Sequence, residues 1–182
     1  MLVSTRVETA RKPVPVLADW AAAIRRCVDV ASADRLPYAV ADTLRGGTAL
    51  GQLLDARQQQ GSAEHYTRHV LHADPAGLFT IVALVWRPGQ ATPVHGHYTW
   101  CAYTVLKGRL EEEQFAWNRQ TSRADYQGRA SKLPGDTVAG HAGLDQIHRL
   151  RNAGTDTAVS IHVYGVAGPR VATHVNRVVA SA

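Results

Sequence analysis

Residues 89–97 read GQATPVHGH, a stretch that ends in two histidines one residue apart. The glycine, threonine and proline before the first histidine are typical of a turn that leads into a strand. Residues two apart share one face of a strand, so the side chains of His95 and His97 point to the same side. Their Cα atoms are then about 6 to 7 Å apart, and both imidazoles can bind one metal ion.

A third histidine, His148, lies in a later β-rich stretch, QIHRL at 146–150. On a nearby strand it would complete a set of three neutral imidazoles. Such a set leaves half of an octahedral coordination shell open, as a redox metal needs in order to bind a substrate and dioxygen together. An HxH pair alone is equally compatible with a polar strand face, so the surrounding sequence has to decide.

Short β-rich runs separated by Gly, Pro and Asn continue from Glu64 to Tyr164. Regularly spaced short strands favour a sandwich or a barrel. Besides the strand that carries HGH, we expect strands at 66–72, 78–86, 100–106, 110–117, 137–140, 146–150 and 158–164.

The first third of the chain has a helical period instead. A single apolar stripe at helical spacing is formed by Leu17, Trp20, Ile24, Cys27 and Val28. Further helices are expected near 38–44 and, after the break at Gly46-Gly47, at 50–57. Residues 1–15 are expected to be a flexible polar arm. We therefore expect one structural domain, in which the arm and helices of 1–60 pack against a β-barrel of 61–182.

The composition is that of a globular protein, because 45% of the 182 residues are hydrophobic and 19% are charged. No apolar run approaches the roughly 20 residues of a membrane helix, and residues 1–15 contain no secretory signal. Cys27 and Cys101 do not resemble a disulfide framework. These features predict a cytoplasmic protein without a membrane partner.

The formal net charge of +5 raises the question of nucleic acid. The basic residues are nearly all Arg and are scattered, with no run of basic and aromatic residues interleaved. This pattern predicts no nucleic-acid partner, and it fits a weak attraction for anionic small molecules equally well.

Two motifs resemble the cupin superfamily. Residues 89–108 match its first motif, G-x5-H-x-H-x3-4-E-x6-G, except that Cys101 stands in place of the glutamate. His148 and Asn152 match the H-x3-N end of its second motif. The resemblance implies a mainly β fold, a jelly-roll-like double-stranded β-helix (cupin) barrel with the N-terminal helices packed against it.

A cupin site that lacks the acidic ligand resembles that of the cysteine dioxygenase family. The stretch SIHVY at 160–164 is similar to the Ser-His-Tyr relay of that family, and YTR at 66–68 resembles its segment for the substrate carboxylate. The resemblance implies one Fe(II) per chain on His95, His97 and His148. It further implies catalytic roles for Tyr164, His162 and Ser160, and substrate binding by Arg68 and Tyr66.

The activity implied is the oxidation of L-cysteine by dioxygen to cysteine sulfinic acid. A neutral three-histidine shell leaves Fe(II) its full charge, which keeps a bound thiol deprotonated, whereas Zn(II) cannot supply electrons. The guanidinium of Arg68 suits a carboxylate. Two alternatives stay open: a 3-mercaptopropionate dioxygenase, whose family members carry Gln in place of Arg68, and a metal-binding cupin module without turnover.

Cys101 has two interpretations. A small buried cysteine is most often an inert hydrophobic residue. In animal members of the family, however, a cysteine on this strand forms a thioether crosslink with the relay tyrosine, so Cys101 and Tyr164 are a candidate crosslinked pair. The strand from His97 to Gly108 is one residue shorter here than in the animal pattern. The oligomeric state is not indicated by the sequence.

Overall fold

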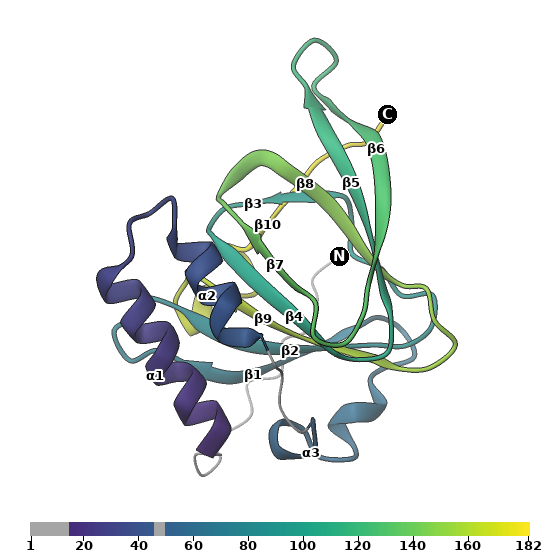
Figure 1. Ribbon diagram of the computed structural model, residues 1–182. Helices are drawn as coiled ribbons and strands as arrows, with labels where there is room; N and C mark the ends of the chain where they lie inside the picture. The colour runs from purple at the N-terminus through teal and green to yellow at the C-terminus, as the bar shows by residue number, and fades with distance from the viewer. Residues whose placement is uncertain (1–14, 46–49) are drawn as a thin grey trace.

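Two five-stranded antiparallel sheets face each other in a barrel, with helices on the outside of one sheet (Figure 1). The computed structural model describes residues 15–45 and 50–182. One sheet has the order β1 (Thr67–Ala73), β2 (Thr80–Trp86), β9 (Ala158–Tyr164), β4 (Cys101–Lys107), β7 (Thr137–Gly140). The other has the order β10 (Asn176–Val178), β3 (His95–His97), β8 (Gly143–Asn152), β5 (Leu110–Asn118), β6 (Arg123–Lys132). This confirms the expected mainly β cupin fold.

Strands β2 and β9 of the first sheet are buried on both faces. Every residue of these two strands is buried. Alternate residues such as Ile161 and Val163 pack outward, in one apolar cluster with Trp20 and Ile24 of α1 (Pro15–Val30) and Leu44 of α2 (Leu36–Leu44). The residues between them point into the barrel. The helices therefore allow this sheet to carry a polar inner face without exposing its apolar outer face.

The helical predictions need two corrections. Pro15 belongs to α1 rather than to the predicted arm, since proline is well tolerated in the first turn of a helix; residues 1–14 and the break at Gly46-Gly47 lie outside the described residues. The helix predicted at 50–57 is only α3 (Leu50–Leu53). It ends because Asp55 and Gln58 cap each other's backbone N–H and start a separate 3₁₀ turn, η1 (Gln58–Gln60).

A second short 3₁₀ turn, η2 (Gly168–Arg170), follows β9. Within 15–45 and 50–182, no helix is both long and apolar enough to cross a membrane.

Strands β6 and β10 were not predicted. β6 forms a hairpin with β5 that projects from the barrel (Figure 1). Its sequence, RADYQGRASK, has mostly exposed or half-buried side chains, so it lacks the apolar alternation that marks a strand. β10 has only three residues and exists because it pairs with β3. The remaining predicted strands agree with the structure, although β8 begins at Gly143, before the predicted 146.

The backbones of β3 and β8 approach unusually closely at Gly96. A Cβ atom added there would lie 2.4 Å from the carbonyl oxygen of Gly143 in β8. Because that neighbour is backbone in a paired strand, it cannot move aside without displacing the strand. Glycine between the two histidines is therefore a requirement of the strand pairing.

We expect Gly96→Ala to lower the free energy of unfolding by about 1 to 3 kcal/mol, the usual cost of forcing an extra methyl group into a packed site. Urea denaturation of the metal-free protein measures this change. Gly128→Ala in β6 is the matched control, because a Cβ there meets nothing within 4 Å. Equal stability of the two variants would contradict the close approach.

Candidate metal centre

Three histidines converge on one point inside the barrel. In the pairing of β3 with β8, His95 lies directly opposite His148, and the register shifts between His95 and His97. The three ring centroids are 4.7 to 5.2 Å apart in pairs. One possible ligand atom from each of the three residues lies within 4.8 Å of the others. The arrangement is that of a group able to hold a single metal ion.

The protonation of these rings suits metal binding. Burial, followed by the neighbouring His148, lowers the pKa of His95 to about 3 and that of His97 to about 2. Both rings are therefore neutral at neutral pH, which is the form that binds metals. The Nδ1 of His95 donates to the carbonyl of Pro93 at 2.9 Å, which leaves its Nε2 lone pair free. Nδ1 of His97 is buried and has no hydrogen-bond partner. The donor set fits a divalent ion.

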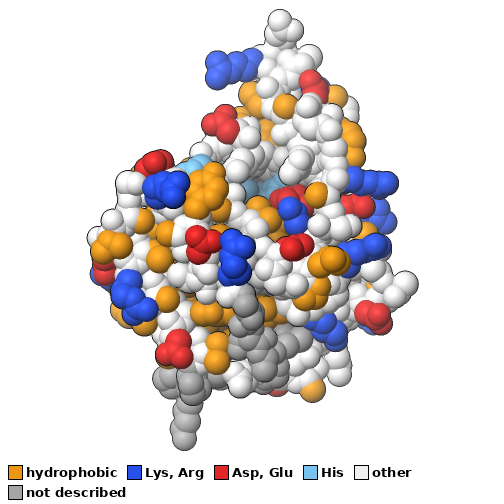
Figure 2. Space-filling model, in the orientation of Figure 1, with side chains coloured by type: hydrophobic (Ala, Val, Ile, Leu, Met, Phe, Trp, Pro, Cys, Tyr) orange, Lys and Arg blue, Asp and Glu red, His pale blue; other side chains and the backbone are white. Residues whose placement is uncertain are grey.

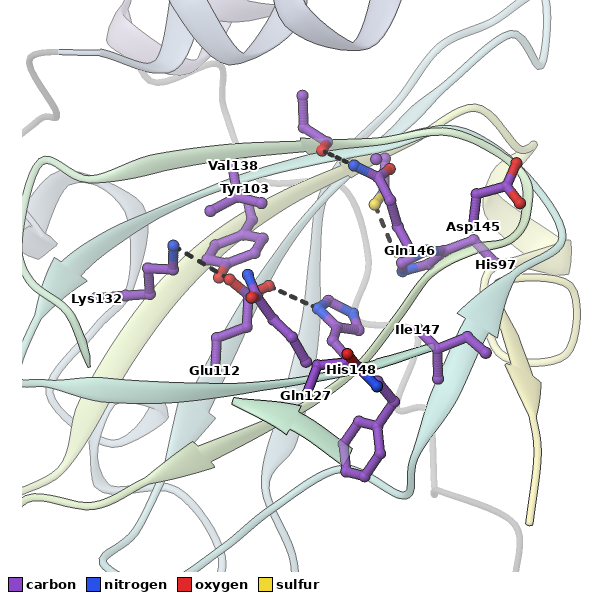
Figure 3. A pocket seen from close by; sticks show the side chains of 15 residues that line it. His97, Tyr103, Glu112, Gln127, Lys132, Val138, Asp145, Gln146, Ile147 and His148 are labelled. Atoms are coloured by element: carbon purple, nitrogen blue, oxygen red, sulfur yellow. Dashed lines mark hydrogen bonds and ion pairs between the residues drawn. The ribbon is translucent and has the colours of Figure 1, made fainter. Parts of the chain in front are cut away.

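His148 has an acidic partner. Its Nδ1 lies 2.7 Å from Oε1 of Glu112, and Oε2 of Glu112 lies 3.1 Å from the ammonium of Lys132 (Figure 3). Burial alone would raise the pKa of Glu112, but the hydrogen bonds from His148 and Lys132 outweigh it and hold that pKa below its ordinary value. Glu112 is therefore a buried carboxylate, not a neutral acid.

Ser160, His162 and Tyr164 form a hydrogen-bonded chain along β9. Ser160 Oγ is 2.8 Å from His162 Nε2, and His162 Nδ1 is 3.1 Å from the Tyr164 hydroxyl. The indole N–H of Trp86 donates to Ser160 Oγ at 2.9 Å. Burial lowers the pKa of His162 well below its ordinary value, so the ring is neutral.

A neutral ring carries one N–H, so two arrangements satisfy these contacts. In the first, the Ser160 hydroxyl donates to Nε2 and Nδ1–H donates to the Tyr164 oxygen; in the second, Nε2–H donates to Ser160 Oγ and the Tyr164 hydroxyl donates to Nδ1. The Tyr164 hydroxyl hydrogen is free in the first arrangement only. Burial also raises the pKa of Tyr164, which keeps this hydrogen in place at neutral pH.

Arg68 of β1 is a buried cation without an acidic partner in the part of the chain that the structure describes. It is 6% exposed, it donates to the carbonyl of Val171 at 2.8 Å, and its Nε has no hydrogen-bond partner. Tyr66 lies beside it and stacks on Trp86 with ring centroids 4.5 Å apart. A buried guanidinium is costly unless paired, so this position suits an anionic ligand.

Cys101 lies directly opposite Tyr164 in the pairing of β4 with β9. Its Sγ is 3.5 Å from Nε2 of His97, and burial raises the pKa of the thiol to about 12. Side chains of directly opposite residues point to the same side of a sheet. The shorter strand from His97 to Gly108 thus still brings Cys101 and Tyr164 side by side.

Two hollows meet at the histidines. A cavity of about 350 Å³ is lined by residues of β3 to β8, including His97, Glu112, Lys132 and His148 (Figure 3). Figure 2 shows histidine surface inside a hollow on the face between the helices and the β5–β6 hairpin. A much smaller pocket of about 10 Å³ contains all three histidines together with Arg68, and both hollows include His97 and His148.

Three residues of the centre were missed by the sequence analysis: Glu112, Lys132 and Trp86. The signal for Glu112 was present, because it shares a strand face with the apolar Leu110 and so faces the core. Lys132 lies on the strand that was not predicted. Trp86 lies at the end of the predicted strand 78–86 but was given no role in the site, and its hydrogen bond to Ser160 depends on the pairing of β2 with β9.

The fold and these three buried histidines define a cupin with a candidate metal centre. The family model for cysteine dioxygenase type I matches residues 56–175, and the chain belongs to that family.

Similar proteins include cysteine dioxygenase type 1 of Danio rerio, 26% identical over 102 residues, and of Rattus norvegicus, 29% identical over 101 residues. Each alignment covers 54% of this chain and 50% of the relative, so the chain spans about half the length of these curated relatives. Among solved structures, the protein TT1209 from Thermus thermophilus has a TM-score of 0.49 at 19% identity, over 65% of this chain and 95% of its own.

We expect the purified protein to bind one divalent ion per chain and His95→Ala to lose most of that binding, because one of three ligands is removed. A Co²⁺ titration of the metal-free protein measures the stoichiometry. The exposed His174 provides the control, and His174→Ala should bind like the wild type. Full binding by a folded His95→Ala variant would show that the ion lies elsewhere.

Proposed function

We propose that this protein is a thiol dioxygenase that holds one Fe(II) on His95, His97 and His148 and oxidises L-cysteine with dioxygen to cysteine sulfinic acid. The observation that carries the proposal is a buried arginine without an acidic partner among the described residues, Arg68, in the same pocket as the three histidines. A substrate with a thiol and a carboxylate matches both parts of this pocket. Membership of the cysteine dioxygenase type I family supports the same reaction class.

Arg68 is proposed to bind the substrate carboxylate. The Nε–H of its guanidinium is free to donate, and a carboxylate accepts two parallel hydrogen bonds from such a group. The ion pair would also compensate a cation that is now buried, with the Val171 carbonyl as a hydrogen-bond acceptor and Tyr66 beside it. Tyr66 is proposed to assist by holding Arg68 in place against Trp86.

Tyr164 is proposed to donate a hydrogen bond to the reacting ligands. This role uses the arrangement in which Ser160 donates to His162 and His162 donates to the Tyr164 oxygen, because the hydrogen of the Tyr164 hydroxyl is then available. The relay would thus present one oriented donor to the pocket.

When bound, a redox-active iron would keep the thiol deprotonated and supply electron transfer between thiol and dioxygen. Both oxygen atoms are added to the sulfur, so the reaction needs no other oxidant or reductant. The role of the protein residues is to position the thiol, hold its carboxylate and direct a hydrogen bond at the reacting atoms.

Access to Arg68 requires side-chain movement. The pocket beside it holds about 10 Å³ of free space, about that of one water molecule. The larger cavity of about 350 Å³ is also lined by His97 and His148. We propose that the thiol enters through the larger cavity, and that the residues between the two hollows shift when its carboxylate reaches Arg68.

Arg68→Gln should lower kcat/KM for L-cysteine by about 10- to 100-fold, because hydrogen bonds to a charged group are worth about 1.5 to 3 kcal/mol. Oxygen consumption with L-cysteine and with 3-mercaptopropionate, at equal iron content, measures the change. Arg177→Gln is the control, since Arg177 is exposed on β10.

Three outcomes would redirect the proposal. Equal or better turnover of 3-mercaptopropionate by the wild type would favour that thiol as the substrate. A wild-type protein that binds iron and consumes no oxygen with either thiol would favour a metal-binding module. An unchanged kcat/KM in Arg68→Gln would remove Arg68 from the substrate site.

We also propose that Cys101 and Tyr164 become joined by a thioether bond: the thiol and the Tyr164 ring each lose one hydrogen, and one dioxygen takes up both with their electrons as hydrogen peroxide. Their positions opposite each other in β4 and β9 support this. After aerobic turnover, mass spectrometry of the digested protein should show a linked peptide lighter by two hydrogen atoms than its two parts together. Cys101→Ser should lack it. Two unmodified peptides from turned-over wild type would contradict the crosslink.

A further inference from the structure

A buried carboxylate stands behind one of the three histidines. Strand β5 contains three consecutive glutamates, Glu111 to Glu113, and strand alternation turns only the middle one into the barrel. Glu112 is 4% exposed. Its two neighbours pair instead with arginines on the other face of the sheet, Glu111 with Arg129 and Glu113 with Arg149.

Glu112 is the middle member of a row across three strands. In the register, Lys132 of β6 lies opposite Leu110, and His148 of β8 lies opposite Gln114. Glu112 is two residues from both positions, so all three side chains share the inner face. One carboxylate oxygen meets His148 Nδ1 at 2.7 Å and the other meets Lys132 Nζ at 3.1 Å (Figure 3).

This row determines the tautomer of His148. A carboxylate paired with an ammonium is only a hydrogen-bond acceptor, so Nδ1 of His148 carries the proton of their hydrogen bond. Nε2 is then the nitrogen left to bind a metal. The other two histidines differ, since His95 donates to a neutral backbone carbonyl and Nδ1 of His97 has no partner. Of the three histidines, His148 alone has a carboxylate as the hydrogen-bond partner of its Nδ1.

We propose that Glu112, anchored by Lys132, is a positioning residue of the metal centre that orients His148 and makes its free nitrogen a stronger ligand. The inference rests on the proposed metal-binding role of His95, His97 and His148, and it is independent of which thiol is oxidised. A carboxylate partner of this kind typically changes metal affinity by about 10- to 100-fold.

The test is the affinity of the metal-free, full-length protein for Co²⁺, measured in competition with a chelator. Glu112→Gln keeps the size of the side chain and removes its charge, and we expect it to bind Co²⁺ about 10- to 100-fold more weakly. The visible absorption of the bound Co²⁺ should change as well. Glu113→Gln is the matched control, because it removes a charge from the next residue on the opposite face, and its affinity should stay that of the wild type.

Lys132→Met provides a second, independent test. This variant keeps the Glu112–His148 hydrogen bond and removes the ion pair between Lys132 and Glu112, so we expect a smaller loss of Co²⁺ affinity than in Glu112→Gln. If Glu112→Gln does not fold, this variant decides, and an unchanged Co²⁺ affinity in it overturns the inference.

A purely structural role for Glu112 makes a different prediction. It would lower the thermal unfolding temperature of metal-free Glu112→Gln and leave the Co²⁺ affinity of the folded protein unchanged, which overturns the proposal. Equal weakening in Glu112→Gln and Glu113→Gln also overturns it, because the effect would then be one of net charge. A wild-type protein that binds no Co²⁺ would instead overturn the metal role of the histidines, and the inference with it.

Discussion

The pairing of β3 with β8 is the constraint on which the centre depends. It places His95 opposite His148, and the register shift beside it brings the His97 ring to the same point. The two backbones approach so closely at Gly96 that no side chain fits between the histidines. β8 in turn pairs with β5, which brings Glu112 behind His148. Metal ligands and their hydrogen-bond partner are therefore positioned by one set of strand pairings rather than by loops, and sites built on strands hold their geometry well.

The opposite sheet supplies the polar groups that face the histidines. Burying Arg68, Ser160, His162 and Tyr164 is tolerable because most of their polar atoms have partners, and because the helices cover the apolar back of the same strands. Three buried polar atoms at the centre stay without a hydrogen bond: Arg68 Nε, His97 Nδ1 and the Tyr103 hydroxyl oxygen. A buried polar atom without a partner is costly. All three lie in residues that line the inner pocket, where a ligand would compensate that cost.

The sequence predicts a strand correctly where the strand is buried and its residues therefore form an apolar run. Strands β2, β4 and β9 are apolar runs that end at Gly or Pro, and they were found within two residues of their observed ends. β6 was missed because its side chains are largely polar and exposed. Its sequence therefore lacks the alternation of apolar and polar residues that a strand with one buried face shows. Glu112 was missed for a different reason. Strand alternation shows that one of Glu111 to Glu113 faces inward with Leu110, but it does not show that a histidine 36 residues away lies there.

Local sequence is enough to establish the period of the strands, the shared face of His95 and His97, and the alternation of Ser160, His162 and Tyr164 along one strand. These follow from the stereochemistry of an extended chain, in which every second side chain points the same way. Three other features are visible only in the folded barrel: His148 lies opposite His95, Trp86 donates to Ser160, and Arg68 is buried without an acidic partner among the described residues. Those facts depend on which strands pair and in what register, and that is set by the packing of the whole barrel rather than by any local stretch.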